Sequence, residues 1–173
     1  HPDQSKWYAN SAVLLSWTTK GGDVQGYSYV INDKPVDVPD DISEGIRDKV
    51  SYTSLGSGIH YFHIKALRKG VWGGVTHFAI NIDTVLPAEF SIDIIPRDKT
   101  TRVRPVIQFA TTDTLSSIDH YELKIIPLFK STDQDKEFLF IEALSPYIPG
   151  ADLELGSYDV IARAYDKAGN FRE

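Results

Sequence analysis

The chain has 173 residues, of which 42% are hydrophobic and 12% aromatic, and a net charge of −6. This is enough apolar material for two small packed cores and is far from the composition of a disordered chain. Charges of both signs are interspersed, which argues against a nucleic-acid surface and against a polybasic membrane anchor, so neither nucleic acid nor membrane insertion is expected.

The sequence contains neither cysteine nor methionine. The lack of cysteine excludes disulfide bonds and thiolate chemistry. No apolar stretch approaches the length of about 18 residues that a transmembrane helix needs. A chain that opens His-Pro-Asp without methionine is expected to be a processed product or a piece of a longer protein.

In the first half of the chain, apolar and polar residues alternate in short stretches that are typical of half-buried strands. Turns containing Gly, Asp and Pro separate these stretches. Residues 32–47 carry two prolines and five acidic side chains, and we expect a loop there with at most a short edge strand. The expected strands are residues 12–18, 26–31, 50–53, 55–66 and 75–83.

A proline within residues 82–89 marks the expected boundary between two domains, 1–84 and 85–173. Polar, turn-rich connections at 113–117 and 130–136 separate the strands of the second domain. Residues 137–144 are ambiguous by periodicity, but their length and phenylalanine content favour a strand. The expected strands are residues 90–95, 105–111, 118–126, 137–142 and 157–165.

One stretch occurs twice, as LGSGIHYFHIKA at 55–66 and LELGSYDVIARA at 153–164. The 98-residue offset is about the size of one β-sandwich module. Alternate positions of both copies are rings or apolar residues, which predicts one buried strand face in each domain. With Trp17 from an earlier strand, the predicted core residues are Phe62, Ile64, Tyr158 and Val160.

These features predict an all-β chain of two consecutive antiparallel β-sandwich modules. After the repeated stretch, the first module continues for 17 residues and the second for nine, so the final strand of the second module is expected to be short or missing. Two explanations remain open. One is that the sequence ends before the strand is complete. The other is that another chain supplies the strand by donation, because an unpaired edge is a template for strand addition.

The pattern SWT, GYSYVIND, VSYTSLGSGIHYFHIKA and VWGGVTHFAINID resembles the fibronectin type III-like and immunoglobulin-like repeats of large bacterial surface proteins. The stretches SSIDHYELKI and ARAYDKAGN resemble bacterial immunoglobulin-like repeats, and IDTVLP resembles the linkers between them. This resemblance implies a fibronectin III-like first module and an immunoglobulin-like second module. It also implies a core tryptophan at Trp17 and a tyrosine corner at Tyr158, with His60 in that place in the first module.

What the resemblance implies for function is an extracellular, cell-surface spacer or adhesion array that is not an enzyme. Its partners would be neighbouring modules of the same protein. The sequence shows no nucleophile, metal-protease or phosphate-binding motif, and the adjacent carboxylates Asp40 and Asp41 lie in a polar loop with little apolar surrounding to raise a pKa. If Trp17 is a core residue, Trp17→Ala should cost about 3–5 kcal/mol.

Three sets of side chains are candidates for binding. His60 and His63 point to opposite faces of one strand, so at most one of them can share a face with His77, and cross-strand packing is the alternative to metal binding. Acidic turns offer hard oxygen ligands for calcium at Asp83, Asp113 and Asp166, although such residues also favour turns without a metal.

The third set is aromatic. Trp72, Tyr8 and Trp7 could form an exposed platform that stacks on a surface glycan or contacts a protein. The alternative is that these rings fold back and close the ends of the sandwich.

Overall fold

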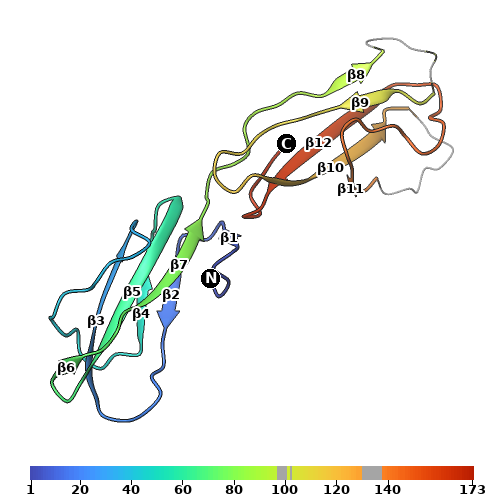
Figure 1. Ribbon diagram of the computed structural model, residues 1–173. Coiled ribbons are helices and arrows are strands. Elements are labelled where there is room, and N and C mark those ends of the chain that lie inside the picture. The colour runs from blue at the N-terminus through green and yellow to red at the C-terminus, as the bar shows by residue number, and fades with distance from the viewer. Residues whose placement is uncertain (97–100, 102, 130–137) are drawn as a thin grey trace. The chain divides into compact units, whose positions relative to one another are not determined.

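The computed structural model describes residues 1–96, 101, 103–129 and 138–173. In this part of the chain, all regular structure is β-strand, which confirms the predicted fold class. Nothing in the same part forms a helix long and apolar enough to cross a membrane. The chain divides into two compact units, His1–Val85 and Leu86–Glu173, one residue beyond the expected boundary (Figure 1).

The first unit is built from two sheets. The larger sheet has the order β1-β7-β5-β3, with β6 beside β5, and the smaller sheet pairs β2 with β4. Neighbouring strands are antiparallel except β1 and β7, which are parallel. The strands are β1 (Trp7–Tyr8), β2 (Val13–Ser16), β3 (Val24–Asn32), β4 (Lys49–Tyr52), β5 (Gly58–Arg68), β6 (Val71–Trp72) and β7 (Thr76–Ile82).

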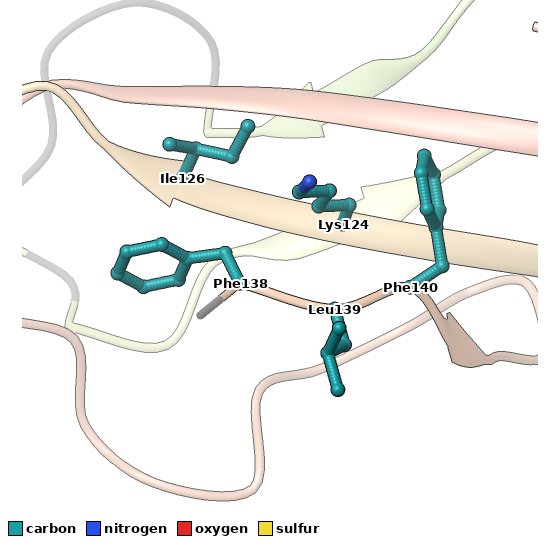
Figure 2. A pocket seen from close by; sticks show the side chains of 5 residues that line it. All are labelled: Lys124, Ile126, Phe138, Leu139 and Phe140. Atoms are coloured by element: carbon teal, nitrogen blue, oxygen red, sulfur yellow. The ribbon is translucent and has the colours of Figure 1, made fainter. Parts of the chain in front are cut away.

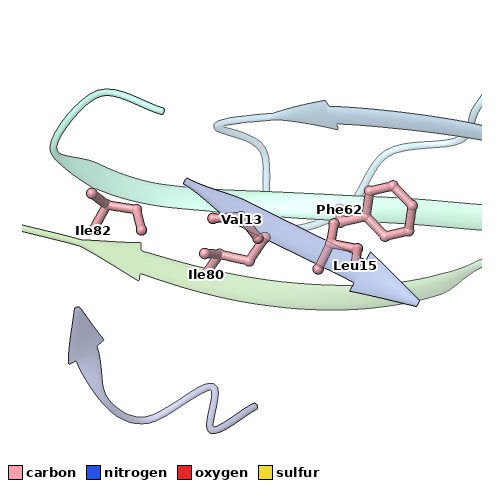
Figure 3. Close-up of a cluster of buried hydrophobic side chains, with 5 residues drawn as sticks. All are labelled: Val13, Leu15, Phe62, Ile80 and Ile82. Atoms are coloured by element: carbon pink, nitrogen blue, oxygen red, sulfur yellow. The ribbon is translucent and has the colours of Figure 1, made fainter. Parts of the chain in front are cut away.

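The core of the first unit lies between these sheets. Val13 and Leu15 of β2 pack with Phe62 of β5 and with Ile80 and Ile82 of β7, and all five side chains are buried (Figure 3). Successive strand residues point to opposite faces, so the alternation in the sequence selects this buried set. Phe78, Ile80 and Ile82 of β7 therefore share the core face.

The second unit repeats this organisation. One sheet has the order β11-β10-β12-β13 and a second pairs β8 with β9, all antiparallel. Its hydrophobic core cluster contains the buried residues Ile107, Phe109, Leu123, Ala143 and Ala162. The strands are β8 (Asp93–Ile95), β9 (Val106–Gln108), β10 (Ile118–Pro127), β11 (Ile141–Glu142), β12 (Tyr158–Asp166) and β13 (Phe171–Arg172).

Two expected strands of the second unit differ from the structure. Of the strand expected at 137–142, only Ile141 and Glu142 pair with β10, while residue 137 lies outside the described residues. The final strand is present but short, because β13 pairs with β12 only at Ala164 and Tyr165.

Candidate functional site

His63 and His77 form a contact across the outer face of the large sheet. They are direct partners on β5 and β7, and their Nδ1 atoms lie 2.6 Å apart. His63 is fully buried, and its Nε2 lies 3.2 Å from Asn32 Oδ1. His60, three residues from His63, takes no part in this contact, as the opposite faces of a strand require.

The hydrogen bonds assign the protons of this histidine pair. Asn32 Nδ2 donates to Asp37 Oδ2 at 2.7 Å, so Asn32 Oδ1 is the atom left to accept from His63 Nε2–H. The Nδ1 of a neutral His63 is then an acceptor, and His77 Nδ1–H donates to it. A second proton between the two Nδ1 atoms would place two N–H groups against each other. The chain of bonds from Asp37 to His77 is therefore satisfied as long as the two rings are not both charged.

Burial, and secondly the neighbouring His77, lower the pKa of His63 below its ordinary value. Asn32 and Lys34 and the Asp37 carboxylate also face its ring. The native state then binds fewer protons than the unfolded state between the lowered pKa and the ordinary value near 6.5. Neutral His63 therefore contributes its full stabilisation of the native state above the ordinary histidine pKa. This stabilisation is lost as the pH falls from the ordinary pKa toward the lowered pKa of His63.

We therefore expect the stability of the first unit to fall between about pH 7 and pH 5. His63→Gln should flatten this pH dependence, whereas His120→Gln, in the second unit, should leave it unchanged. Chemical denaturation at a series of pH values, followed by tryptophan fluorescence, measures the effect because Trp7, Trp17 and Trp72 all lie in the first unit. If the free energy of unfolding changed with pH equally in the wild type and in His63→Gln, the pH dependence would not come from His63.

Two of the three predicted calcium ligands lie together in the second unit. Asp113 and Asp166 offer carboxylate oxygens within 4.8 Å of each other. Asp113 Oδ1 accepts from the backbone N–H groups of Leu115, Ser116 and Ser117, but its Oδ2 is buried and has no hydrogen-bond partner among the described residues. A buried carboxylate oxygen without a partner is costly.

The Asp166 carboxylate is held more completely. Its Oδ1 accepts from Ala168 N and Asn170 N, and its Oδ2 accepts from Asn170 Nδ2, in the turn between β12 and β13. Asp83, the third candidate, follows β7 in the first unit, where its Oδ1 accepts from Val85 N. Asp83 and Asp166 thus each stabilise the turn in which they lie, as Asp does in proteins without a metal.

Calcium binding remains a prediction and has a direct test. If Asp113 and Asp166 bind the ion, calcium should raise the melting temperature of the second unit in calorimetry, and a chelator should reverse the rise. Calcium at 100 times its dissociation constant would add about 2.7 kcal/mol. Asp113→Asn should remove the response, and Asp159→Asn, an exposed carboxylate of β12, should retain it. An unchanged melting temperature would leave these residues as turn formers.

The predicted aromatic residues do not form one platform. Trp7 and Tyr8 of β1 lie beside Asn81 and Ile82, whereas Trp72 of β6 lies beside Leu67. On β5 these two places are nine residues apart, from Gly58 to Leu67, or roughly 30 Å along an extended strand. The Tyr8 ring packs against the core, so it helps to close the sandwich.

Trp72 has its own surroundings. The Lys65 Nζ lies 4.9 Å from the centre of its ring, and the ring is half-buried. It borders an open hollow of about 440 Å³. The other residues that line this hollow are Ala66, Arg68, Val71, Gly73 and Gly74.

The predicted corner residues make the same bond in both units. Tyr158 Oη donates to the carbonyl of Glu154 at 2.9 Å, four residues upstream. His60 Nε2 lies 2.7 Å from the carbonyl of Gly56, also four residues upstream. Histidine therefore substitutes for tyrosine at the corner of the first unit. The remaining predicted core residues, Trp17, Ile64 and Val160, are partly buried against their clusters.

A patch that the sequence analysis missed lies on the second unit. Phe140 lies between cations, with the Arg163 guanidinium 3.7 Å and the Lys124 Nζ 5.4 Å from its ring centre. Figure 2 shows Phe138 and Phe140 beside the strand that carries Lys124 and Ile126, with Leu139 pointing away. The only sequence signal for this patch was the alternation of phenylalanine and aliphatic residues near position 140.

The adjacent carboxylates considered for catalysis are both used in structural contacts. Ser28 Oγ donates to Asp40 Oδ1 at 3.1 Å, and Lys65 Nζ donates to Asp41 Oδ1. Each carboxylate thus holds the loop against the sheet, and the two do not face a shared cavity among those found in the described residues.

Comparison with known proteins identifies the fold. No protein-family model and no curated protein matches the sequence. Among solved structures, the chain is similar to the fibronectin(III)-like modules of Clostridium thermocellum CbhA, with a TM-score of 0.50 and 11% identity over 99% of this chain and 86% of that one. Chicken CNTN1 domains FN1–FN3 align with a TM-score of 0.37 and 13% identity, over 96% of this chain and 57% of that one.

The chain therefore has a fibronectin III-like fold, as its sequence resemblance implied. Modules of this fold are often non-catalytic parts of larger proteins and are often extracellular. The fold by itself does not specify a ligand.

Proposed function

We propose that the chain is a pair of non-catalytic spacer and adhesion modules from a bacterial cell-surface or secreted protein. The observation that carries this proposal is that each unit has its own sheets and its own buried core. Two such modules in succession extend a chain while each remains folded by its own contacts. The likeness to fibronectin(III)-like modules supports the same role.

A surface-display fusion tests this role. The chain is placed between a bacterial outer-surface anchor and an epitope tag, and a flexible Gly/Ser linker of equal length is the control. We expect the tag to stay accessible to antibody and the chain to survive added protease that cleaves the control linker. Folded modules resist because cleavage requires local unfolding. Cleavage at the rate of the linker would contradict a spacer role.

A glycan- or protein-binding role is a second candidate, favoured by the open hollow beside Trp72. A half-buried ring that borders an open hollow beside a hydrogen-bonding side chain such as Arg68 suits a sugar ring. A glycan array with Trp72→Ala and the matched control Trp7→Ala tests it. Binding lost only in Trp72→Ala supports the role, and binding that both variants retain, or none in the wild type, contradicts it.

A further inference from the structure

Residues 33–48, here called the strap, join β3 to β4 and lie over a polar face of the large sheet. Ser28, His63 and Lys65 occupy that face, because their strand neighbours Tyr29, Phe62 and Ile64 face the core. All three polar side chains are at least 95% buried.

The inner side of the strap is held by polar contacts. Asp37 accepts from Asn32, Asp40 from Ser28, and Asp41 from Lys65. The backbone also pairs along the edge of β3, where Tyr27 N donates to Gly45 O at 2.9 Å and Glu44 N donates to Tyr27 O at 2.8 Å.

Two further features fix the conformation of the strap. Pro39, one of its own residues, is buried. Ser43 fills the space at Gly26 so closely that a Cβ there would lie 1.9 Å from Ser43 Oγ. The strap therefore has a defined shape, and the orientation of its side chains is a property of the fold.

Although Asp37, Asp40 and Asp41 bond to the sheet, most of the strap is exposed, and its aliphatic side chains reach the solvent beside its carboxylates. Val36, Val38, Ile42 and Ile46 are 72%, 66%, 70% and 72% exposed. Single exposed aliphatic residues are common, but a group of them on one fixed segment is typical of an interaction site.

The charge of the strap indicates what could cover these aliphatic side chains. Six of its residues are acidic and two are basic, in a chain whose total charge is −6. Another copy of the strap, an anionic lipid surface or a nucleic acid would bring like charges together. A sugar would find no aromatic ring within residues 33–48. The complementary occupant is a protein surface that combines apolar contacts with lysine or arginine side chains.

We propose that the strap is a docking surface for a basic protein partner, with Val38 and Ile42 at the centre of the contact. This surface lies within the first unit and does not depend on the spacer role. Its binding is the sum of apolar burial and charge attraction, so affinity should fall as the salt concentration rises.

The test uses a defined probe, an amphipathic peptide of alternating lysine and leucine, and measures its anisotropy on binding the whole chain. Val38→Thr with Ile42→Thr should weaken binding at least about tenfold, because the two changes remove apolar contacts from the centre of the interface. The matched control is Leu139→Thr with Leu144→Thr, two exposed residues of the second unit, and it should bind as the wild type does. Raising the salt from about 50 to 200 mM should weaken the wild type.

Three outcomes would overturn the proposal. The first is an undetectable interaction of the wild type with the peptide, and the second is equal binding by the strap variant. The third is self-association in sedimentation that the strap variant abolishes, because a second copy would then cover the strap. Unchanged melting temperatures of both variants establish that they are folded.

Discussion

Phe62→Ala should lower the free energy of unfolding of the first unit by about 3–5 kcal/mol, the cost of removing a buried aromatic ring. Phe62 is 4% exposed and contacts the Trp17 and Tyr29 rings at centroid distances of 5.7 Å. Truncation therefore leaves a cavity and removes ring contacts as well. Denaturation followed by tryptophan fluorescence isolates this unit.

Ile46→Ala is the control for this substitution. Its side chain is 72% exposed, and a change there should stay within about 0.5 kcal/mol. Trp17→Ala should lower the free energy of unfolding by an amount near the lower end of the range given for Phe62→Ala, because the indole also borders an open cleft of about 410 Å³. A loss below about 1 kcal/mol for Phe62→Ala would show that the two sheets do not pack around this ring.

The second large effect is expected in the other unit. Leu123→Ala should cost about 2–5 kcal/mol, because Leu123 is fully buried between Phe109, Ala143 and Ala162. Leu144→Ala removes the same atoms from a side chain that is 83% exposed and should be nearly neutral. Calorimetry measures the resulting shift in the melting temperature of the second unit.

If the two cores are independent, Leu123→Ala should leave the tryptophan-detected transition of the first unit at its wild-type midpoint. The effects of Phe62→Ala and Leu123→Ala should also add, as they do for distant sites without shared partners. A shifted tryptophan transition in Leu123→Ala would show that the units unfold together.

The sequence was most informative where one strand face is buried. The alternation in β5, β7 and β12 predicted which residues face the core, because a period of two directly encodes the two faces of a strand. The repeated stretch also located the corner residues His60 and Tyr158, although the imidazole bond to Gly56 needed coordinates.

The sequence was least informative where contacts join distant positions. The polar loop expected at 32–47 gave no sign that its carboxylates would turn toward Ser28 and Lys65, because that orientation depends on partners 12 and 24 residues away. Likewise, the sequence left open whether residues 7, 8 and 72 form one aromatic platform or close the ends of the sandwich, because their separation along β5 follows from strand register. Residue type indicates possible chemistry, and register determines which residues meet.

The parallel pairing of β1 with β7 has a mechanical consequence for the first unit. Tension on this unit would enter through the segment before β1 and leave through the segment after β7. Asp83 N donates to Tyr8 O, and Asn81 Nδ2 donates to the carbonyls of Gln4 and Lys6. Residues 4–8 are thus bonded directly to residues 81–83. Because the strands are parallel, pulling their outer ends apart loads these bonds in shear, all at once, instead of unzipping them one by one. The first unit should therefore resist stretching more than its thermodynamic stability alone would suggest.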